Sequence, residues 1–363
     1  MEVFEAMTEI KVGLHTDIER TFPLLLRRYE NILKYNGIAV ERLYLGDADF
    51  LDRCRSVNYF VSCFSQFDAI NQMVNSILPV IESVYGIPCY PNLQTRWHYD
   101  DKVRQSYLLA SRNFPMVKTW VFWDLRAVME WVQKVTFPVV FKLKGGAGSS
   151  NVVLVRTPDH ALSLAKRMFS YDGIRTGRIP VGGNIARNKG SRLLYKIKRL
   201  YAERSGNIKS YAHNLCRSIH HDYALFQEFL PGNTCDIRVN IIGNRAFSFR
   251  RMVRKNDFRA SGSGMIDYDI NKIDHRCLEI AFSVSDFFGF QSMAYDFVYD
   301  KEGDPKIVEI SYTYVDTAVQ ACTGFFDRTL QWHEGHFWPQ YCQLQDLLEM
   351  DDLVQPAEEV MSI

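Results

Sequence analysis

The chain has 363 residues, of which 47% are hydrophobic and 23% charged, and its formal net charge is +1. This length predicts two or three globular domains, and the balanced charge gives no reason to expect binding to nucleic acid. The eight cysteines occur singly, without a C-x-x-C pair or a zinc spacing, and no stretch is apolar enough for a signal segment or a membrane span. We therefore expect a cytoplasmic protein with reduced thiols.

The first predicted unit covers residues 1–98, where short apolar runs alternate with amphipathic stretches. Strands are expected at 10–14, 40–45 and 59–64. Helices are expected at 22–35, ending at Asn36-Gly37, and at 69–84, with a kink at Pro79. Alternating strands and helices of this kind predict a small α/β domain with a parallel sheet.

The second predicted unit covers residues 99–331 and contains most of the expected strands. Helices are expected at 102–112, at 124–134 with Asp124 as the N-cap, and at 274–288. Strands are expected at 116–122, 137–144, 151–156, 223–230, 236–242, 245–251, 294–299 and 306–312. We divide this unit at about residue 230 and treat 332–363 as a C-terminal tail, helical from about 343 and then frayed.

A basic insertion at 172–222 interrupts the second unit. Between Arg175 and Arg217 it carries about ten more positive than negative charges, whereas the remainder of the chain is about −9. Residues 192–203 have the pattern of a basic amphipathic helix. Three roles stay open for the insertion: guiding an anionic substrate such as an acidic sugar or polymer, binding a partner or membrane surface, or forming a solvated mobile segment.

Two carboxylates are expected to face each other near the C-terminal end of the second unit. A hairpin turn centred on Glu302-Gly303 places Asp296 opposite Glu309, with their Cβ atoms roughly 4.5–5.5 Å apart. In this register Val298 and Ile307 share the face of the carboxylates, and Val308 lies on the other face. Such a pair repels unless a cation lies between its members, so the pattern favours a Mg²⁺ site, with Ser311 as a further oxygen ligand. Two solvated acids on an exposed hairpin are the alternative.

A lysine and a glycine loop suggest a phosphate site. Lys142 lies within an apolar strand and therefore needs an anionic partner, and Lys144-Gly145-Gly146-Ala147-Gly148-Ser149-Ser150 follows it directly. Small residues allow backbone N–H groups to approach phosphate oxygens closely. No G-K-[ST] follows, so this is not a Walker loop, and a plain hairpin turn is the alternative.

Two further strands supply candidate residues. The strand that contains Gln227 and Glu228 ends at Leu230 with backbone groups able to meet an adenine edge, although a generic strand explains it equally well. Arg238 and Arg251 lie on alternating strands, and arginine forks suit phosphates and carboxylates. Both are also unremarkable as surface strand residues.

Taken in order, these motifs resemble the ATP-grasp superfamily over roughly residues 95–315. The nearest likeness is to the carboxylate–amine ligases of that superfamily, with more distant likeness to biotin carboxylase and D-alanine–D-alanine ligase. The C-terminal motifs are also similar to ATP-grasp proteins that accompany bacterial surface-polysaccharide genes. The motifs are DDK at 100–102, FPVVFKLKGGAGSSNV at 137–152, QEFLPG at 227–232, DIRVNIIGNRAFSFRR at 236–251, NDFRASGSG at 256–264, D…E-x-S at Asp296, Glu309 and Ser311, and EISYTYV…WHEGHFWP near the end.

The resemblance implies an α+β ATP-grasp fold, in which a Rossmann-like N-terminal domain precedes two subdomains that clamp ATP. The lid would span about 117–230 and the metal-binding subdomain 231–331. The family's functional roles map onto this sequence as follows: Lys102 and Lys142 on the phosphates; Gly145, Gly146, Gly148 and Ser149 in the closing loop; Gln227, Glu228 and Leu230 at adenine; Asp236 at the ribose; Arg238 and Arg251, with Lys142, at the reacting phosphate; Asp296, Glu309 and Ser311 on Mg²⁺ or Mn²⁺.

The resemblance further implies an ADP-forming ligase that activates a carboxylate as an acyl phosphate for attack by an amine. Most members have asparagine where this chain has Ser311, whose shorter side chain leaves room for a water molecule beside the metal. The alternatives are a regulatory ATP-binding module without turnover and an ATP-grasp kinase. Neither the substrates nor the oligomeric state follow from the sequence.

Overall fold

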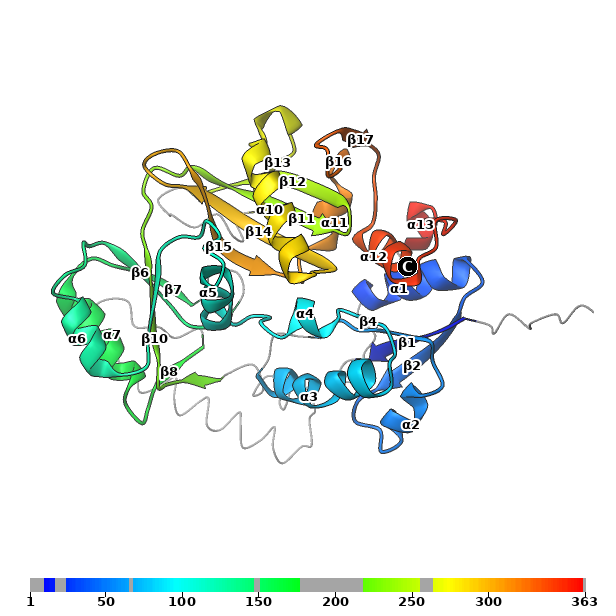
Figure 1. The fold of residues 1–363 in the computed structure, drawn as a ribbon, viewed down its shortest axis with the longest axis horizontal. Coiled ribbons are helices and arrows are strands. Elements are labelled where there is room, and N and C mark those ends of the chain that lie inside the picture. The colour runs from blue at the N-terminus through cyan, green and yellow to red at the C-terminus, as the bar shows by residue number, and fades with distance from the viewer. Residues whose placement is uncertain are drawn as a thin grey trace, which may run out of the picture.

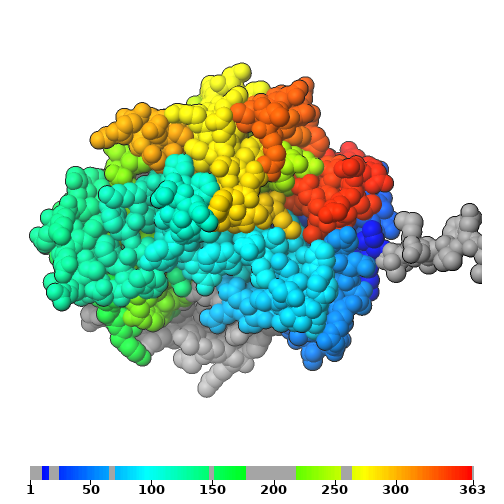
Figure 2. Space-filling model, in the orientation of Figure 1, coloured from blue at the N-terminus to red at the C-terminus, as the bar shows by residue number. Residues whose placement is uncertain are grey.

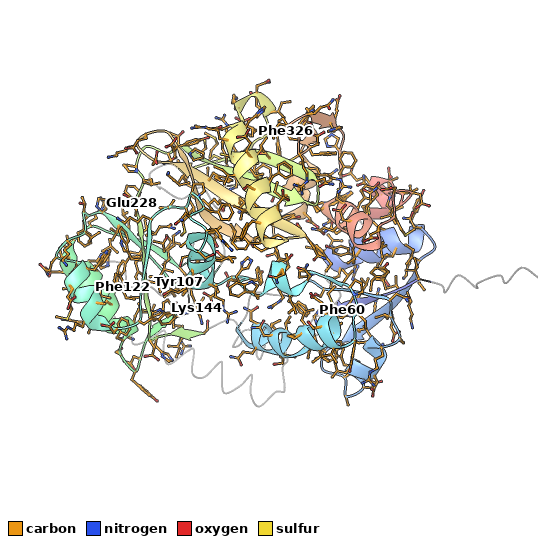
Figure 3. All side chains as sticks on the ribbon, in the orientation of Figure 1. Phe60, Tyr107, Phe122, Lys144, Glu228 and Phe326 are labelled. Carbon is orange, nitrogen blue, oxygen red and sulfur yellow. The ribbon has the colours of Figure 1, made fainter. Side chains whose placement is uncertain are left out.

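A computed structural model describes residues 10–16, 24–64, 68–146, 151–176, 218–254 and 264–361. Its described strands form three main sheets of four, four and seven strands, and one two-stranded ribbon. Figure 1 shows the first sheet at one end of the molecule (blue) and the second at the other (green), with the third beside both (yellow to orange). Phe60, Phe122 and Phe326 mark these three parts in Figure 3.

The first sheet is parallel, as predicted, with the strand order β2-β1-β3-β4. Its strands are β1 (Lys11–Thr16), β2 (Ala39–Tyr44), β3 (Tyr59–Val61) and β4 (Cys89–Tyr90). The helices here are α1 (Leu24–Tyr35), α2 (Phe50–Cys54), α3 (Asp68–Pro79) and the π-helical turn η1 (Val80–Val84). Instead of a simple kink, Pro79 marks the change from α- to π-helix, because its ring removes one N–H donor from the helix.

The second sheet is antiparallel, with the order β5-β10-β6-β7. Its strands are β5 (Thr119–Phe122), β6 (Val139–Lys142), β7 (Val152–Val155) and β10 (Ala224–Glu228). The helices α6 (Leu125–Trp131) and α7 (Pro158–Met168) contribute Val128, Leu164 and Met168 to the core of this sheet. The Asp124 side chain accepts a hydrogen bond from the Ala127 N–H at 2.8 Å, which confirms the predicted N-cap of α6.

The third sheet has the order β15-β14-β11-β12-β16-β17, with β13 paired to β12. Its strands are β11 (Cys235–Ile242), β12 (Arg245–Met252), β13 (Ile266–Asp267), β14 (Ser292–Tyr299), β15 (Pro305–Ser311), β16 (Gly324–Phe326) and β17 (Trp332–Glu334). The 3-10 turn η2 (Ile270–Lys272), helix α10 (His275–Phe288) and helix α11 (Asp316–Gln320) accompany it. Leu278 and Ala281 of α10 join Val239 and Tyr295 in its core, which leaves the opposite face free to carry polar residues.

Two short helices connect the sheets. They are α4 (Leu93–Arg96) and α5 (Lys102–Ala110), and Figure 1 shows both between the outer parts of the molecule. The Asp101 carboxylate accepts hydrogen bonds from the N–H groups of Val103 and Arg104, both at 3.1 Å, and so caps the start of α5. This cap fixes the position at which the Lys102 side chain leaves the helix.

The C-terminal segment is not a frayed tail. Helices α12 (Pro339–Leu348) and α13 (Glu358–Met361) pack against α1, and Trp338, Leu344 and Met361 share one apolar core with Leu14 of β1. Figure 2 shows this segment (red) seated against the N-terminal part (blue). The acidic sequence suggested a solvated end, but its widely spaced apolar residues complete the core of the first sheet.

Only the two ends of the basic insertion lie within the described residues. They form an antiparallel ribbon of β8 (Ile174–Arg175) and β9 (Ile219–His220). The helix expected at 192–203 lies outside the described residues. Within the part of the chain that the structure describes, no helix is both long and apolar enough to cross a membrane.

Candidate functional site

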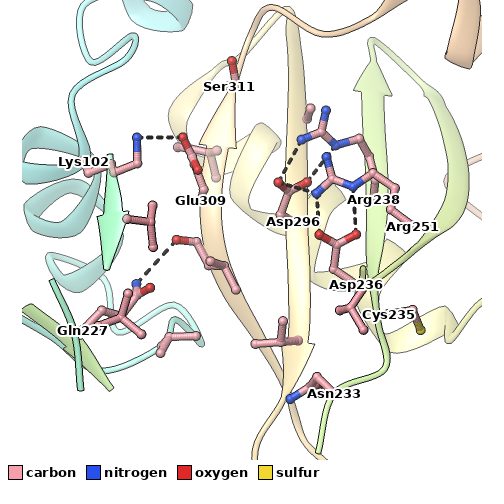
Figure 4. Close-up of a pocket in the computed structure, with 18 of the residues that line it drawn as sticks. Lys102, Gln227, Asn233, Cys235, Asp236, Arg238, Arg251, Asp296, Glu309 and Ser311 are labelled. Atoms are coloured by element: carbon pink, nitrogen blue, oxygen red, sulfur yellow. Dashed lines mark hydrogen bonds and ion pairs between the residues drawn. The ribbon is translucent and has the colours of Figure 1, made fainter. Parts of the chain in front are cut away.

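A cavity of about 670 Å³ lies between the second and third sheets (Figure 4). Its lining comes from α5, β6, β10, β11, β12, β14 and β15 together with adjoining loops. Gly145 does not line the cavity, and Gly148 and Ser149 lie outside the described residues. The remaining predicted site residues all contribute to its wall: Lys102, Lys142, Gly146, Gln227, Glu228, Leu230, Asp236, Arg238, Arg251, Asp296, Glu309 and Ser311.

The two predicted carboxylates face each other as expected. Asp296 of β14 pairs with Glu309 of β15, but the register shifts immediately beyond this pair, so that Phe297 is opposite Ile307. The prediction that Ile307 shares the face of the carboxylates is therefore wrong. Ile307 is buried in the core below the sheet, and Val308 lines the cavity instead. A β-bulge of this kind places one extra residue in a strand, so that the side chains on the far side of the bulge point to the opposite face of the sheet from the one predicted.

Asp296 is enclosed by two arginines. Arg238 donates from Nε and Nη2 to the two Asp296 oxygens at 2.7 and 2.8 Å, and Arg251 Nη2 lies 2.6 Å from Asp296 Oδ2. Both arginines come from strands next to one another in the sheet, which brings the two guanidinium groups to one carboxylate. Burial raises the pKa of Asp296, but the charges of Arg238 and Arg251 outweigh burial and hold this pKa below its usual value.

Asp236 belongs to the same cluster. Its carboxylate accepts two hydrogen bonds from Arg251, at 2.8 and 2.5 Å, across the β11–β12 ladder. Burial and the nearby charge of Asp296 raise the pKa of Asp236. The resemblance suggested that Asp236 holds the ribose, yet in this structure both of its oxygens bind Arg251. Its visible role is to orient that arginine.

Lys102 lies on the opposite side of the carboxylate pair. Its ammonium is 3.0 Å from Glu309 Oε1 and donates to the carbonyl oxygen of Gly146 at 3.3 Å. Burial lowers the pKa of Lys102, but Glu309 and Asp100 outweigh burial and raise it. A single lysine therefore joins the metal-ligand candidate Glu309 to the start of the glycine loop.

Lys142 contrasts with Lys102. It is 6% exposed, and its ammonium donates to the side-chain oxygen of Gln227 at 2.5 Å. Among the described residues no carboxylate lies within 4 Å of it, so the anionic partner expected from the sequence is not supplied by this part of the chain. Burial lowers the pKa of Lys142 to about 8, with Glu309 opposing that effect. A buried cation with an amide as its partner is suited to an incoming anion.

The start of the glycine loop is fixed by a residue whose role the sequence did not reveal. Both oxygens of Asp100 accept from the Gly146 N–H at 2.9 Å, and the Asn151 amide donates to Gly145 O at 2.8 Å. A Cβ on Gly145 would lie 2.9 Å from Asp100 Oδ2, so this approach requires glycine. Asp100 itself has a φ of 50°, a left-handed conformation that aspartate tolerates better than most residues.

The end of β10 forms another wall of the cavity. Gln227 is held by three contacts, because its amide nitrogen also donates to Thr119 Oγ1 at 3.0 Å and to Val308 O at 3.5 Å. Figure 4 shows the last of these contacts bridging the second and third sheets. Glu228 and Leu230 follow at the edge of the cavity. The backbone of 228–230 is therefore available to an occupant of the cavity.

The residues present fit a magnesium–nucleotide occupant. Two carboxylates and one hydroxyl stand on neighbouring strands, and oxygen donors are the ligands that Mg²⁺ prefers. Ser311 Oγ now donates to Thr313 O at 2.8 Å, a contact that metal binding would exchange. Among the described residues no three His, Cys, Asp or Glu side chains are placed so that they could hold a metal ion together. The protein therefore offers two carboxylates and leaves other positions to phosphate oxygens and water.

Comparison with known proteins bears on the fold. A scan of protein-family models finds no match, and a search of curated proteins finds no significant relative. Among solved structures, the carboxyaminoimidazole ribonucleotide synthase of Aspergillus clavatus in complex with ATP matches 96% of this chain and 78% of its own, with a TM-score of 0.56 and 9% identity. A biotin carboxylase from Campylobacter jejuni matches 97% and 73%, with a TM-score of 0.54 and 12% identity.

The ATP-grasp ligase PsnB, complexed with a minimal precursor, matches 86% of this chain and 94% of its own, with a TM-score of 0.50 and 12% identity. At these identities the likeness establishes the fold and leaves the substrates undetermined. The three proteins nevertheless agree with the prediction drawn from the order of the motifs. This chain has the α+β ATP-grasp fold.

Proposed function

We propose that the protein is an ADP-forming ligase that uses Mg-ATP to activate a carboxylate for attack by an amine. The observation that carries this proposal is the charge arrangement in the cavity. Among the described residues the buried Lys142 has no carboxylate partner. Asp296 contacts Arg238 and Arg251, and the facing Glu309 contacts Lys102. A site that only bound adenosine would not need this set of charges.

Each part of the cavity has a role in this proposal. The backbone at 228–230 would meet adenine, and Lys102 and Lys142 would neutralise the phosphates from two sides. Asp296, Glu309 and Ser311 would hold Mg²⁺, which offsets phosphate charge and aligns the transferred group. Arg238 and Arg251 would then stabilise the charge that develops on the reacting oxygens.

The proposed reaction has two steps, phosphoryl transfer and then acyl transfer. A substrate carboxylate oxygen forms a bond to the γ-phosphorus while the bond to the bridging oxygen breaks, which gives an acyl phosphate and ADP. The amine nitrogen then bonds to the acyl carbon, inorganic phosphate leaves, and the nitrogen loses a proton to water. Alignment and charge neutralisation are the tasks left to the protein, and no side-chain nucleophile is required.

One observation favours a second candidate, an ATP-binding module without turnover. Asp296 is held by two arginines, so a metal must replace at least one of these contacts before it binds. Ser311, the short third ligand, adds to the same argument. In this alternative the cavity binds nucleotide but transfers no phosphate.

Trapping with hydroxylamine separates these functions. The protein is incubated with Mg-ATP, hydroxylamine and a panel of small carboxylic acids, and both ADP and hydroxamate are measured. A ligase gives ADP and hydroxamate in equal amounts with at least one acid, and the Lys142→Met variant gives neither. Mg-ATP binding without ADP release across the panel would favour the regulatory module, whereas ADP without hydroxamate would indicate phosphate transfer to water or to a hydroxyl group.

A further inference from the structure

Arg96, at the end of α4, is a buried cation without a carboxylate partner among the described residues. The side chain is 2% exposed, and its two terminal nitrogens donate to Asn75 Oδ1 at 2.9 Å and Asn71 Oδ1 at 2.7 Å. Its guanidinium also lies 5.4 Å from the ring centre of Phe64. Neutral amides and an aromatic ring only partly compensate a buried positive charge.

Arg28 shows how this protein otherwise treats a buried arginine. It is 6% exposed, forms an ion pair with Asp316 and lies 4.1 Å from the ring centre of Trp338. The two arginines thus share burial and an aromatic contact, but only Arg28 has a carboxylate. Arg96 is therefore the exception that needs an explanation.

Further unsatisfied polar atoms gather around Arg96. Among the described residues its own Nε has no hydrogen-bond partner, and neither has Nδ1 of His15, whose ring is 4.4 Å from that of Phe64. The Tyr312 hydroxyl lies next to the guanidinium and to the backbone of Phe64. Buried polar atoms are nearly always paired, so two unpaired nitrogens beside one aromatic ring are unusual.

The position of this cluster also points to a ligand. His15 is near the carboxyl end of β1 and Phe64 follows that of β3, and these ends of a parallel sheet are where α/β domains bind ligands. Tyr312 packs against Tyr99, with ring centres 4.6 Å apart, and Tyr99 lines the cavity described above. The cluster therefore adjoins the cavity through Tyr99.

We propose that Arg96, with Tyr312 and His15, binds an anionic group of the small-molecule substrate. This group is distinct from the carboxylate that reacts, because Tyr99 and Tyr312 stand between Arg96 and the reacting end of the cavity. The substrate class is thus a small acid with a second anionic group. That the bound anion belongs to a substrate rests on the proposed function, whereas anion binding by the cluster can be tested without nucleotide.

The first experiment compares the melting temperatures of Arg96→Met and Arg28→Met. Asn71 is half-buried and Asn75 exposed, so water can satisfy both amides once the guanidinium is removed. We expect Arg96→Met to melt within about 1 °C of wild type or above it, since an uncompensated buried charge is lost. Arg28→Met should melt at least about 5 °C lower, because the Asp316 carboxylate loses the cation with which it forms an ion pair. An equal fall in the melting temperatures of both variants would show that Arg96 stabilises the fold and would overturn its assignment to anion binding.

The second experiment measures anion binding directly. Melting curves are recorded in 100 mM sodium acetate, in 100 mM acetamide with sodium chloride, and in sodium chloride alone at matched ionic strength. Acetate should raise the melting temperature of wild type by about 2 °C, with no rise in Arg96→Met, and neutral acetamide should have no effect. The same rise in both proteins, or none in wild type, would exclude an anion site at Arg96.

The two proposals fail in different ways. Acetate binding is measured without ATP, so it stands if hydroxylamine trapping yields no product. Conversely, an active ligase whose Arg96→Met variant keeps its KM for every accepted acid would retain the proposed function and refute the role of Arg96. If the role is correct, the KM for the acid rises at least about tenfold in Arg96→Met, with little change in the KM for ATP.

Discussion

Asp296 and Glu309 lie opposite each other on β14 and β15, yet they are neutralised from opposite sides. Asp296 binds Arg238 and Arg251, while Glu309 binds Lys102 of helix α5. The first set of contacts is contained in the third sheet, whereas the second joins that sheet to the base of the glycine loop. Binding of a metal ion between the two carboxylates would therefore release contacts on both sides.

The Glu309 variant tests the metal site. At 100 times its Kd, Mg-ATP should stabilise the wild type by about 2.7 kcal/mol, a rise of several degrees in melting temperature. We expect Glu309→Gln to lose the magnesium-dependent part of this rise, because an amide is a weaker ligand. Glu302→Gln, in the exposed hairpin turn, is the control. A full magnesium-dependent rise in Glu309→Gln would show that the metal binds elsewhere.

Lys142 should make nucleotide binding dependent on pH. Its pKa is lowered to about 8 by burial, and phosphate oxygens favour the charged form. Affinity for ATP should consequently fall as the pH rises above 8, and binding at pH 8 should take up about half a proton. Calorimetry in two buffers with different ionisation enthalpies measures this uptake. Lys142→Arg, which stays charged, should take up no proton, and equal uptake by both proteins would assign the effect to another group.

The Arg251 variant tests the buried ion cluster. Arg251→Met removes both hydrogen bonds that Arg251 donates to Asp236 and one contact of Asp296. Loss of one member of a buried ion pair costs about 3–5 kcal/mol of unfolding free energy, which urea denaturation measures. Arg276→Met, whose pair with Asp274 is exposed, should leave the midpoint unchanged. Equal shifts of the denaturation midpoint in the two variants would show that burial of the ion cluster adds nothing to the free energy of unfolding.

The C-terminal segment should be needed for a stable N-terminal core. Leu344 is fully buried there, so Leu344→Ala is expected to cost about 2–5 kcal/mol in urea denaturation. Val354, which is 51% exposed, supplies the matched control as Val354→Ala. A negligible effect of Leu344→Ala would mean that the segment packs against the core without stabilising it.

Much of the fold follows from local pattern. The parallel order of β1, β2 and β3 and the cap at Asp124 were predictable, because strand–helix alternation and capping residues act over a few positions. The apolar residues of the C-terminal segment are too widely spaced to reveal their partners. These residues become buried only when they pack against the N-terminal part, including α1, which lies more than three hundred positions away in the sequence.

The functional site likewise combines features that the local sequence predicts with features that depend on tertiary contacts. By itself the sequence determined which charged residues are available and that a hairpin brings the strands of Asp296 and Glu309 together. Tertiary structure decided that a bulge turns Val308 into the cavity and pairs Asp296 with Glu309, and that Asp100 fixes the glycine loop. It also decided that Arg96 is buried with no carboxylate partner among the described residues. These features depend on side chains brought together from distant strands, and neither the burial of a charge nor the identity of its partner is encoded in neighbouring residues.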